Sequence, residues 1–299
     1  MPERTPLDGV IVVDKPEGWT SHDVVNKVRR ISGTKKVGHL GTLDPIATGV
    51  LPLVIGRATR LAQFYTRSDK IYEGVVRFGW STNTYDRAGE ATSEKRQVVL
   101  DPAQLERLLE LFRGEISQTP PPVSAKKIDG RRAYDLARAA VAVELEPVNV
   151  HVYELSVLAI DAADVRLLAH CSGGTYLRSI AHDLGQALGC GAHLQELRRV
   201  ASGEFTIEQA RTIEQLARLA ADERLIDALV PVADLLPGFP AVYVEEPVVA
   251  QIRHGRNFPA SPFRAQPASR HVKAITASGE LVAIGEAVLP NLYHPMVVL

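Results

Sequence analysis

The chain has 299 residues, a formal net charge of -1, and hydrophobic and charged fractions of 45% and 23%. These values are typical of soluble globular proteins, and the length predicts about two domains. With only two cysteines, we expect no disulfide framework, and a reducing cytoplasm is the expected compartment. We also expect no secretory leader and no membrane span, because no stretch has the required apolar length.

The first part of the chain predicts strands and helices in alternation, bounded by turn and cap residues. We expect strands at residues 9–13, 51–55 and 70–79, and helices at 20–31, 58–67 and 101–112. Thr20-Ser21 and Asp101-Pro102 are suitable N-terminal caps for the first and third of these helices. Residues 81–90 are polar and rich in turn formers, and they predict a loop.

Because a net charge of -1 does not favour the binding of a polyanion, a nucleic-acid site has to come from local clusters of basic residues. One cluster comprises Lys27, Arg29, Arg30, Lys35 and Lys36. It is either a solvated helix end, where cations suit the helix dipole, or a patch that faces phosphates.

The other cluster comprises Lys126, Lys127, Arg131 and Arg132, within an insertion at about 117–145. This insertion predicts a mobile loop and a helix near 133–140, which is suited to binding a polyanion.

The second half of the chain predicts two long strands, a helix, and a change of character near residue 240. We expect strands at 148–160 and 165–171, a helix at 176–188 that Thr175 caps, and a helical, acidic region at 205–236. Short strand-like runs at 272–276, 281–288 and 295–299 then indicate a small β-rich unit. We therefore predict a first domain at 1–238 and a second domain at 239–299.

The stretch from Gly38 to Pro52 is the main candidate for chemistry, because Asp44 lies in its middle among mostly apolar or small residues. Pro45 disfavours the α region for Asp44, and the nearby glycines permit backbone conformations with positive φ. We therefore expect Asp44 on an extended or turn backbone. The alternative is that Asp44 caps a helix that begins at Pro45. A carboxylate that is sequestered from water yet ionised requires a cationic partner.

The sequence contains none of the common cofactor or metal motifs. There is no glycine-rich dinucleotide or phosphate-binding loop, no H-E-x-x-H helix and no G-x-S-x-G turn. His170-Cys171 together with Cys190 and His193 is a combination that suggests zinc, but adjacent residues of a strand face opposite ways. We therefore expect no metal and no cofactor, which leaves a carboxylate as the reactive group.

Four segments of the chain coincide, in order, with motifs of one enzyme family. They are Asp14-Lys15-Pro16-x-Gly18-x-Thr20-Ser21, Gly38-His39-x-Gly41-Thr42-Leu43-Asp44-Pro45, Lys70-x-Tyr72 and Gly174-Thr175-Tyr176-x-Arg178-Ser179. A further block, Gly191-Ala192-His193-Leu194-x-x-Leu197-Arg198-Arg199, is similar to the same family. Together the segments span about residues 9–206 and resemble the TruB-type pseudouridine synthases.

This resemblance implies the pseudouridine synthase fold, an α+β fold with a mainly antiparallel sheet flanked by helices. It also implies an isomerase, since stand-alone bacterial members convert uridine 55 in the tRNA T-arm to pseudouridine without a cofactor, after base flipping. Asp44 would be the catalytic carboxylate, which either attacks the nucleotide covalently or removes a sugar proton. Arg178 would pair with Asp44 and keep it ionised, and Tyr72 would lie against the uracil ring.

The same resemblance implies further contacts with the substrate. Tyr176 and Leu197 would line the pocket, and His39 would lie at its mouth. Lys15 and Asp86 would make supporting contacts. The chain departs from the family pattern at Asn83 and Leu40, which affects local loop contacts rather than the carboxylate or the arginine.

The run from Gly279 to Gly285 resembles part of a PUA-type RNA-binding barrel, although a generic strand-turn-strand would have the same pattern. We expect a cytoplasmic monomer that binds the T-arm of tRNA, with no membrane and no obligate protein partner. Two other functions stay open. One is an RNA-binding factor that assists tRNA folding, and the other is a guide-RNA-dependent subunit of a ribonucleoprotein, as in archaeal relatives.

Overall fold

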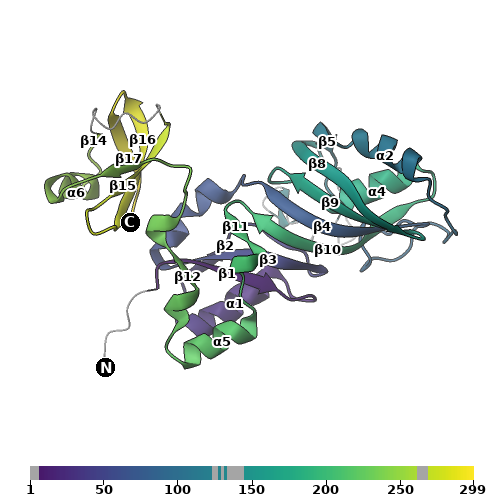
Figure 1. Ribbon diagram of the computed structural model, residues 1–299, viewed down its shortest axis with the longest axis horizontal. Helices are drawn as coiled ribbons and strands as arrows, with labels where there is room; N and C mark the ends of the chain where they lie inside the picture. Colours follow the sequence, from purple (N-terminus) through teal and green to yellow (C-terminus); the bar gives the residue numbers. More distant parts are fainter. Residues whose placement is uncertain (1–6, 123–126, 129–130, 133–144, 261–268) are drawn as a thin grey trace.

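The computed structural model describes residues 7–122, 127–128, 131–132, 145–260 and 269–299, and its main feature is a long, twisted sheet (Figure 1). The strands of this sheet are β1 (Gly9–Lys15), β2 (Val37–His39), β3 (Ala47–Ile55), β4 (Lys70–Phe78), β5 (Gly114–Gln118), β8 (Val148–Asp161), β9 (Asp164–Cys171), β10 (Ala192–Ser202), β11 (Phe205–Thr206) and β12 (Leu229–Pro231). Their order is β12-β1-β3-β10-β4-β9-β8-β5, with β2 paired to β3 and β11 to β10. These pairs are antiparallel except β3 with β10, which is parallel. The predicted α+β fold class is therefore confirmed.

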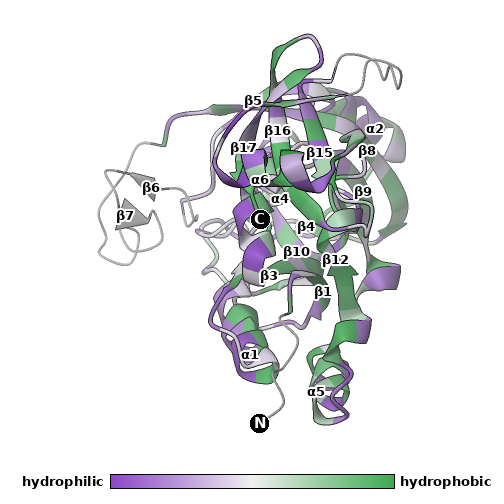
Figure 2. Cartoon of the chain, turned by 90° about the vertical axis from the view of Figure 1, so that its left-hand side faces the viewer, coloured by the Kyte–Doolittle hydropathy of each residue, from purple (hydrophilic) through white to green (hydrophobic). Residues whose placement is uncertain are grey.

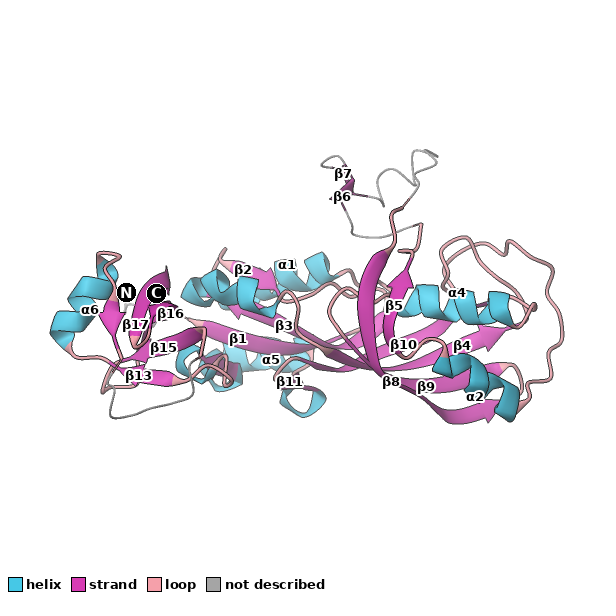
Figure 3. Ribbon diagram, turned by 90° about the horizontal axis from the view of Figure 1, so that it is seen from above, coloured by secondary structure: helices cyan, strands magenta, loops and turns pink. Residues whose placement is uncertain are grey.

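One face of the sheet is covered by helices α1 (Ser21–Ser32), α2 (Pro102–Glu110), α4 (Leu177–Ala187) and α5 (Ile213–Ala221). Apolar residues of all four helices join those of the sheet in one core cluster. In Figure 2 the helices α1 and α5 carry both hydrophobic and hydrophilic residues, as amphipathic helices do. Figure 3 shows α1 beside β2 and β3, and α4 beside β10. The helices therefore flank the two parts of the sheet that meet at the β3–β10 pair.

The helix α1 shows how local sequence sets these elements. Its cap is Thr20, whose hydroxyl accepts a hydrogen bond from the Asp23 backbone N–H at 3.1 Å, while the Asp23 carboxylate accepts one from the Thr20 N–H at 2.9 Å. This reciprocal capping box satisfies two N–H groups that the helix itself leaves unpaired. Val24, Val25 and Val28 are buried, as their spacing predicted.

The C-terminal strands form a second sheet of β13 (Ala241–Tyr243), β14 (Phe258–Pro259), β15 (His271–Ile275), β16 (Leu281–Leu289) and β17 (Leu292–Val298), with the helix α6 (Glu246–Arg253) beside them. A small C-terminal β-rich domain is thus present, and the last three predicted strands are confirmed. The residue bounds 1–238 and 239–299 remain predictions.

The two sheets share one apolar core. Residues of β1 and β3 pack with Tyr65, Leu235, Ile284 and Val297 in a single cluster. At the edge of this cluster the ring of Phe239 lies 5.5 Å from that of Phe64 and 5.1 Å from that of His271. The Lys273 ammonium donates to the Ala233 and Leu235 carbonyls, each at 3.0 Å. The second sheet is therefore packed against the first along a buried contact.

Several expectations about local structure are wrong or only partly right. The expected helix at 58–67 is the 3-10 helix η1 (Gly56–Tyr65). The region 205–236 contains α5 but also β11, β12 and the short 3-10 helices η2 (Ile207–Gln209), η3 (Leu225–Ala228) and η4 (Val232–Asp234). In this region residues 229–231 pair with β1 and form the edge of the sheet instead of continuing a helix, because tertiary pairing overrides weak helical preference.

Two further expectations concern caps and the basic insertion. Thr175 does not cap α4: its hydroxyl donates to the Ser172 carbonyl at 2.9 Å, and Tyr176 occupies the cap position. Within the insertion at 117–145, the structure describes the pair β6 (Lys127–Ile128) and β7 (Arg131–Arg132). The expected helix near 133–140 lies outside the described residues. Among those residues, no helix is long and apolar enough to cross a membrane.

Candidate active site

A cavity of about 350 Å³ opens at the centre of the large sheet. Its walls come from the loop between β2 and β3, from β4 and β10, and from the turn that leads into α4. The predicted residues Asp44, Tyr72, Tyr176, Arg178 and Leu197 all line it. The structure therefore brings together five residues that lie far apart in the chain.

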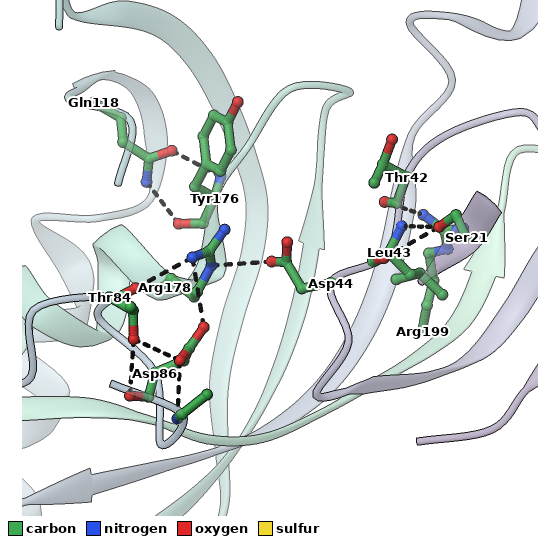
Figure 4. Close-up of polar contacts among 11 residues, drawn as sticks. Ser21, Thr42, Leu43, Asp44, Thr84, Asp86, Gln118, Tyr176, Arg178 and Arg199 are labelled. Carbon is green, nitrogen blue, oxygen red and sulfur yellow. Dashed lines mark hydrogen bonds and ion pairs between the residues drawn. The ribbon is translucent and has the colours of Figure 1, made fainter. Parts of the chain in front are cut away.

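Asp44 lies in a turn between β2 and β3, where the Ala47 N–H donates to the Asp44 carbonyl at 3.0 Å. The alternative expectation, a helix that begins at Pro45, is wrong because residues from Ala47 onward form β3. Ser21 holds the residue before Asp44: its hydroxyl accepts from the Leu43 N–H at 2.8 Å and donates to the Leu43 carbonyl at 3.1 Å. Figure 4 shows this contact beside the Asp44 side chain.

Lys15 holds the residue after Asp44. Its buried ammonium donates to the carbonyls of Pro16 at 2.9 Å and Trp19 at 2.6 Å, and reaches that of Pro45 at 3.5 Å. Burial lowers the pKa of Lys15 to about 8, while nearby Asp44 raises it. Lys15 does not line the cavity and supports the Asp44 loop from behind, so the substrate contact expected for it stays a prediction.

Arg199 holds the loop from a second side. It is fully buried, and it donates to the carbonyls of Val50 at 2.7 Å, Gly41 at 3.1 Å and Thr42 at 3.5 Å. These three carbonyls lie before and after Asp44 in the chain. Since buried donors and acceptors are costly to leave unpaired, this set of contacts fixes the backbone on both sides of the carboxylate.

Arg178 extends from the first turn of α4 to Asp44, with its Nε 2.9 Å from the Asp44 Oδ2 (Figure 4). Its Nη1 lies 3.4 Å from the Asp86 Oδ2 and donates to the Thr84 carbonyl at 3.2 Å. Asp86 is itself buried and accepts hydrogen bonds from the Thr84 hydroxyl at 2.7 Å and the Ala88 N–H at 3.0 Å. One guanidinium is therefore shared between two carboxylates, and the loop at 81–90 fixes its direction.

The surroundings of Asp44 have opposing electrostatic effects. Desolvation raises the pKa of the Asp44 carboxyl, and the Arg178 guanidinium acts in the opposite direction. The Asp86 carboxylate adds to the rise in the pKa of Asp44. The Asp44 side chain keeps 37% of its surface exposed, against 5% for Arg178. A carboxylate with this exposure stays within reach of a molecule in the cavity while the arginine behind it is fixed.

Tyr72 and Leu197 form the apolar part of the cavity wall. They lie on the adjacent strands β4 and β10 and are 7% and 9% exposed. Burial raises the pKa of the Tyr72 hydroxyl, and the hydrogen bond to Arg199 lowers it in part. A neutral aromatic ring beside a carboxylate is a surface on which a planar base can stack.

Tyr176 is held through its backbone at the start of α4. Its N–H donates to the side-chain oxygen of Gln118 at 2.8 Å, and its carbonyl accepts from the same amide group at 3.0 Å. This two-point contact, visible in Figure 4, joins the end of β5 to the helix that carries Arg178. Gln118 has a positioning role that no sequence pattern pointed to.

His39, like Lys15 and Asp86, is a predicted site residue that the structure does not place among the cavity-lining residues. It lies on β2, opposite Leu53 of β3, and does not line the cavity. Burial and the nearby Arg199 lower the pKa of His39. Its expected contact at the mouth therefore remains a prediction about the RNA-bound state.

Two cavity residues, Lys70 and Arg199, were not among the predicted site residues. Both belong to motif segments already quoted from the sequence, so their positions were marked but their roles were not. In the structure Lys70 is 7% exposed and Arg199 is fully buried. Buried cations at the wall of a cavity are a stronger sign of function than exposed ones.

No group of three or more His, Cys, Asp or Glu side chains in the described part of the chain is arranged to hold a metal ion. His170 and Cys171 are neighbours on β9, where successive side chains point to opposite faces. Burial raises the pKa of Cys171 to about 11, which disfavours the thiolate that zinc requires. The cavity residues described above thus supply a carboxylate, cations and aromatic rings as its chemical groups.

Comparison with known proteins gives a consistent result over nearly the whole chain. The model of the TruB family pseudouridylate synthase N-terminal domain matches residues 29–177, and that of the tRNA pseudouridylate synthase B C-terminal domain matches residues 178–236. A tRNA pseudouridine synthase B of Solibacter usitatus (strain Ellin6076) is 74% identical over 293 residues, 98% of this chain and 100% of that protein. A tRNA pseudouridine synthase B of Stutzerimonas stutzeri (strain A1501) is 42% identical over 95% of this chain and 92% of that protein.

Solved structures with a similar fold include chains of two larger complexes. A chain of a Cbf5-Nop10-Gar1 complex superposes with a TM-score of 0.72 and 29% identity, over 97% of this chain and 85% of that chain. A chain of an H/ACA RNP bound to a substrate RNA containing 2′-deoxyuridine gives a TM-score of 0.74 and 28% identity, over 97% and 84%. The fold is thus that of a pseudouridine synthase. The chain belongs to the TruB family of pseudouridylate synthases.

Proposed function

We propose that this protein converts uridine 55 in the T-arm of tRNA to pseudouridine, with Asp44 as the catalytic carboxylate and no cofactor. The observation that carries this proposal is the 2.9 Å contact between Arg178 and Asp44 at the wall of the cavity. The names of the relatives from Solibacter usitatus and Stutzerimonas stutzeri support tRNA as the substrate.

The reaction requires that the N-glycosidic bond of uridine breaks, that the uracil turns, and that its C5 bonds to C1′. The C5 proton then leaves and N1 is protonated, so no atom is gained or lost. Asp44 acts either by attack on the nucleotide or by removal of a sugar proton. Both routes need an ionised carboxylate, which Arg178 favours by its positive charge.

The target base has to leave its stack in the RNA to reach Asp44, and this costs a few kcal/mol. Tyr72 offers a ring against which the flipped uracil stacks, a contact worth about 1–3 kcal/mol per base. Tyr176 and Leu197 complete the wall of the cavity. The binding of the base by Tyr72 thus offsets much of the cost of flipping it.

The decisive test is the mapping of pseudouridine in unmodified tRNA treated with the purified protein. We expect one new pseudouridine at position 55 with the wild-type chain and none with Asp44→Asn, while both bind tRNA with similar affinity. Asp14→Asn is the matched control, because Asp14 pairs with Arg198 on the opposite face of the sheet. Pseudouridine formed by Asp44→Asn would remove the catalytic role of Asp44.

Two related tests, one with added partners and one in a strain that lacks the gene, separate the other two functions. If tRNA is modified only after other proteins or a guide RNA are added, the chain is a ribonucleoprotein subunit, as the Cbf5 complexes suggest for their own chains. If Asp44→Asn restores every phenotype of a strain that lacks the gene, assistance to tRNA folding is the main function. We expect neither outcome, and we expect the active form to be a monomer in the cytoplasm.

A further inference from the structure

The cavity contains more positive than negative side chains. Lys70, Arg178 and Arg199 line it, whereas Asp44 is the carboxylate among its lining residues. Arg178 lies between Asp44 and Asp86, at 2.9 Å and 3.4 Å, so its charge is balanced. The cavity therefore has a surplus of positive charge that comes from Lys70 and Arg199.

Within the described residues, no carboxylate forms an ion pair with Lys70 or Arg199. The N–H groups of Arg199 are directed to backbone carbonyls of the Asp44 loop. The Lys70 ammonium donates to the Ser68 carbonyl, which leaves two of its three N–H donors for another acceptor. A buried cation is costly unless an anion pairs with it.

Lys70 and Arg199 meet at Gly41, three residues before Asp44 in the chain. A side chain at position 41 would lie 3.5 Å from the Lys70 Cε and 3.6 Å from the Arg199 Nη1. The backbone at Gly41 has a φ of +122°, which favours glycine. Burial lowers the pKa of Lys70 and Arg199 lowers it further, while Cys171 and Asp69 raise it in part. The two cations are thus packed against the loop that carries the catalytic carboxylate.

We propose that Lys70 and Arg199 form a subsite for one phosphodiester of the RNA, next to the nucleotide that enters the cavity. Lys70 donates to a phosphate oxygen, and Arg199, whose donors are already used, contributes its charge. This inference rests on the proposed function, because it is that reaction which brings a phosphate to the cavity together with the uridine. The phosphate neutralises the surplus charge, and its capture holds the flipped nucleotide in place.

The test is a double-substitution cycle between Lys70 and the RNA. The substrate is a T-arm stem-loop with one neutral methylphosphonate at the phosphate 5′ or 3′ of the target uridine. With the wild-type protein we expect kcat/KM to fall about 10-fold for one of these two RNAs, as for the loss of a charge-assisted hydrogen bond. On the unmodified RNA, Lys70→Met should have a kcat/KM about 10-fold below that of the wild type. On the methylphosphonate RNA that slows the wild type, the kcat/KM of Lys70→Met should be little lower than on the unmodified RNA. Lys70→Arg should keep the discrimination.

Lys95→Met is the matched control, because Lys95 is exposed, lies outside the cavity and belongs to neither basic cluster. It should respond to each methylphosphonate as the wild type does. The slope of the logarithm of the RNA-binding constant against the logarithm of the salt concentration should become shallower by about 0.7 for Lys70→Met. This is the value for one phosphate contact with a single strand. Thermal unfolding shows whether each variant is folded.

The outcomes separate this inference from the proposed function. If the wild type forms pseudouridine but neither methylphosphonate lowers kcat/KM, the subsite is wrong and the enzyme assignment stands. This arm uses no protein variant, so it decides the matter even if Lys70→Met does not fold. The subsite would also be overturned if the activation free-energy losses from Lys70→Met and from the methylphosphonate were simply additive. If the wild type forms no pseudouridine on unmodified RNA, the proposed function itself fails.

Discussion

Arg198 and Arg199 are neighbours on β10, yet they lie on the two opposite faces of the large sheet. Arg199 is fully buried and fixes three carbonyls around Asp44. The Arg198 side chain is 40% exposed and pairs with Asp14 at 2.8 Å. An arginine therefore fixes the backbone on the cavity face, whereas on the other face an arginine forms an ion pair that contributes little to stability.

The difference extends to the rest of the two faces. On the cavity face, polar side chains are buried and contact backbone groups, as Lys15, Ser21 and Gln118 do. On the other face, the pairs Arg77–Asp164 and Arg87–Glu17 are partly exposed ion pairs. Contacts to the backbone fix a site more firmly than surface pairs do, because an unpaired buried group carries the full cost of its lost hydration. Substitutions on the two faces test this comparison.

The largest effect is expected for Arg178→Met. This change removes the guanidinium from between Asp44 and Asp86 and leaves both carboxylates without their arginine ion pair. Breaking a buried pair costs about 3–5 kcal/mol, which corresponds to a loss of roughly 10²–10⁴-fold in the rate of isomerisation if the whole cost falls on the transition state. Single-turnover kinetics with tRNA measure this loss, and Arg178→Lys should recover only part of it because it lacks the planar fork. A rate within a few-fold of wild type would contradict the role given to Arg178.

The next effect is a loss of stability in Arg199→Met. The carbonyls of Val50, Gly41 and Thr42 would lose their buried donor, and each unpaired group costs about 1–3 kcal/mol. We expect the free energy of unfolding to fall by about 3 kcal/mol, as determined from urea denaturation. An unchanged midpoint would show that water replaces the guanidinium without cost.

A smaller effect is a shift of the pH profile in Asp86→Asn. Burial raises the pKa of Asp44, so activity that needs the ionised carboxylate is lost on acidification at a higher pH than for an ordinary aspartate. The Asp86 charge contributes to this rise. Its removal should therefore lower the pKa of Asp44 and move the acidic limb of the rate profile to lower pH. A limb that moves to higher pH would contradict the electrostatic account.

The smallest effect is expected for Arg198→Met, the counterpart of Arg199→Met on the other face. Its pair with Asp14 is partly exposed, and such pairs contribute about 0–1 kcal/mol. Unfolding in urea should show a change within that range, and pseudouridine formation should stay at the wild-type rate. If the two variants lost equal stability, the contrast between the faces would be wrong.

The sequence predicted most of the elements around the cavity, because their signals are local. Alternating apolar residues marked β4 and β9, and the capping residues marked the starts of α1 and α2. The contact between Asp44 and Arg178 was expected from a family resemblance, since no local pattern relates two residues so distant in the chain. The structure shows the contact itself.

Other features of the site depend on long-range packing. Asp86 was expected as a supporting residue, but its contact with Arg178 was not. The second carboxylate on Arg178, Asp86, follows Tyr85, which has a φ of 64° although it is not glycine, and whose ring stacks on His182 at 3.8 Å. A non-glycine residue in this conformation is favoured only when its surroundings impose it. The parallel pairing of β3 with β10 and the contact of Gln118 with Tyr176 are likewise products of tertiary structure.

The shared core between the two sheets has a consequence for how RNA is selected. Because Phe64, Phe239 and His271 pack together and Lys273 is bonded to carbonyls on the other side, the C-terminal sheet sits at a set distance from Asp44. An RNA that contacts both the cavity and the C-terminal sheet must therefore span a fixed distance. Stem length would then decide whether a uridine reaches the carboxylate, so adding or removing one base pair between the two points of contact should exclude an otherwise correct loop.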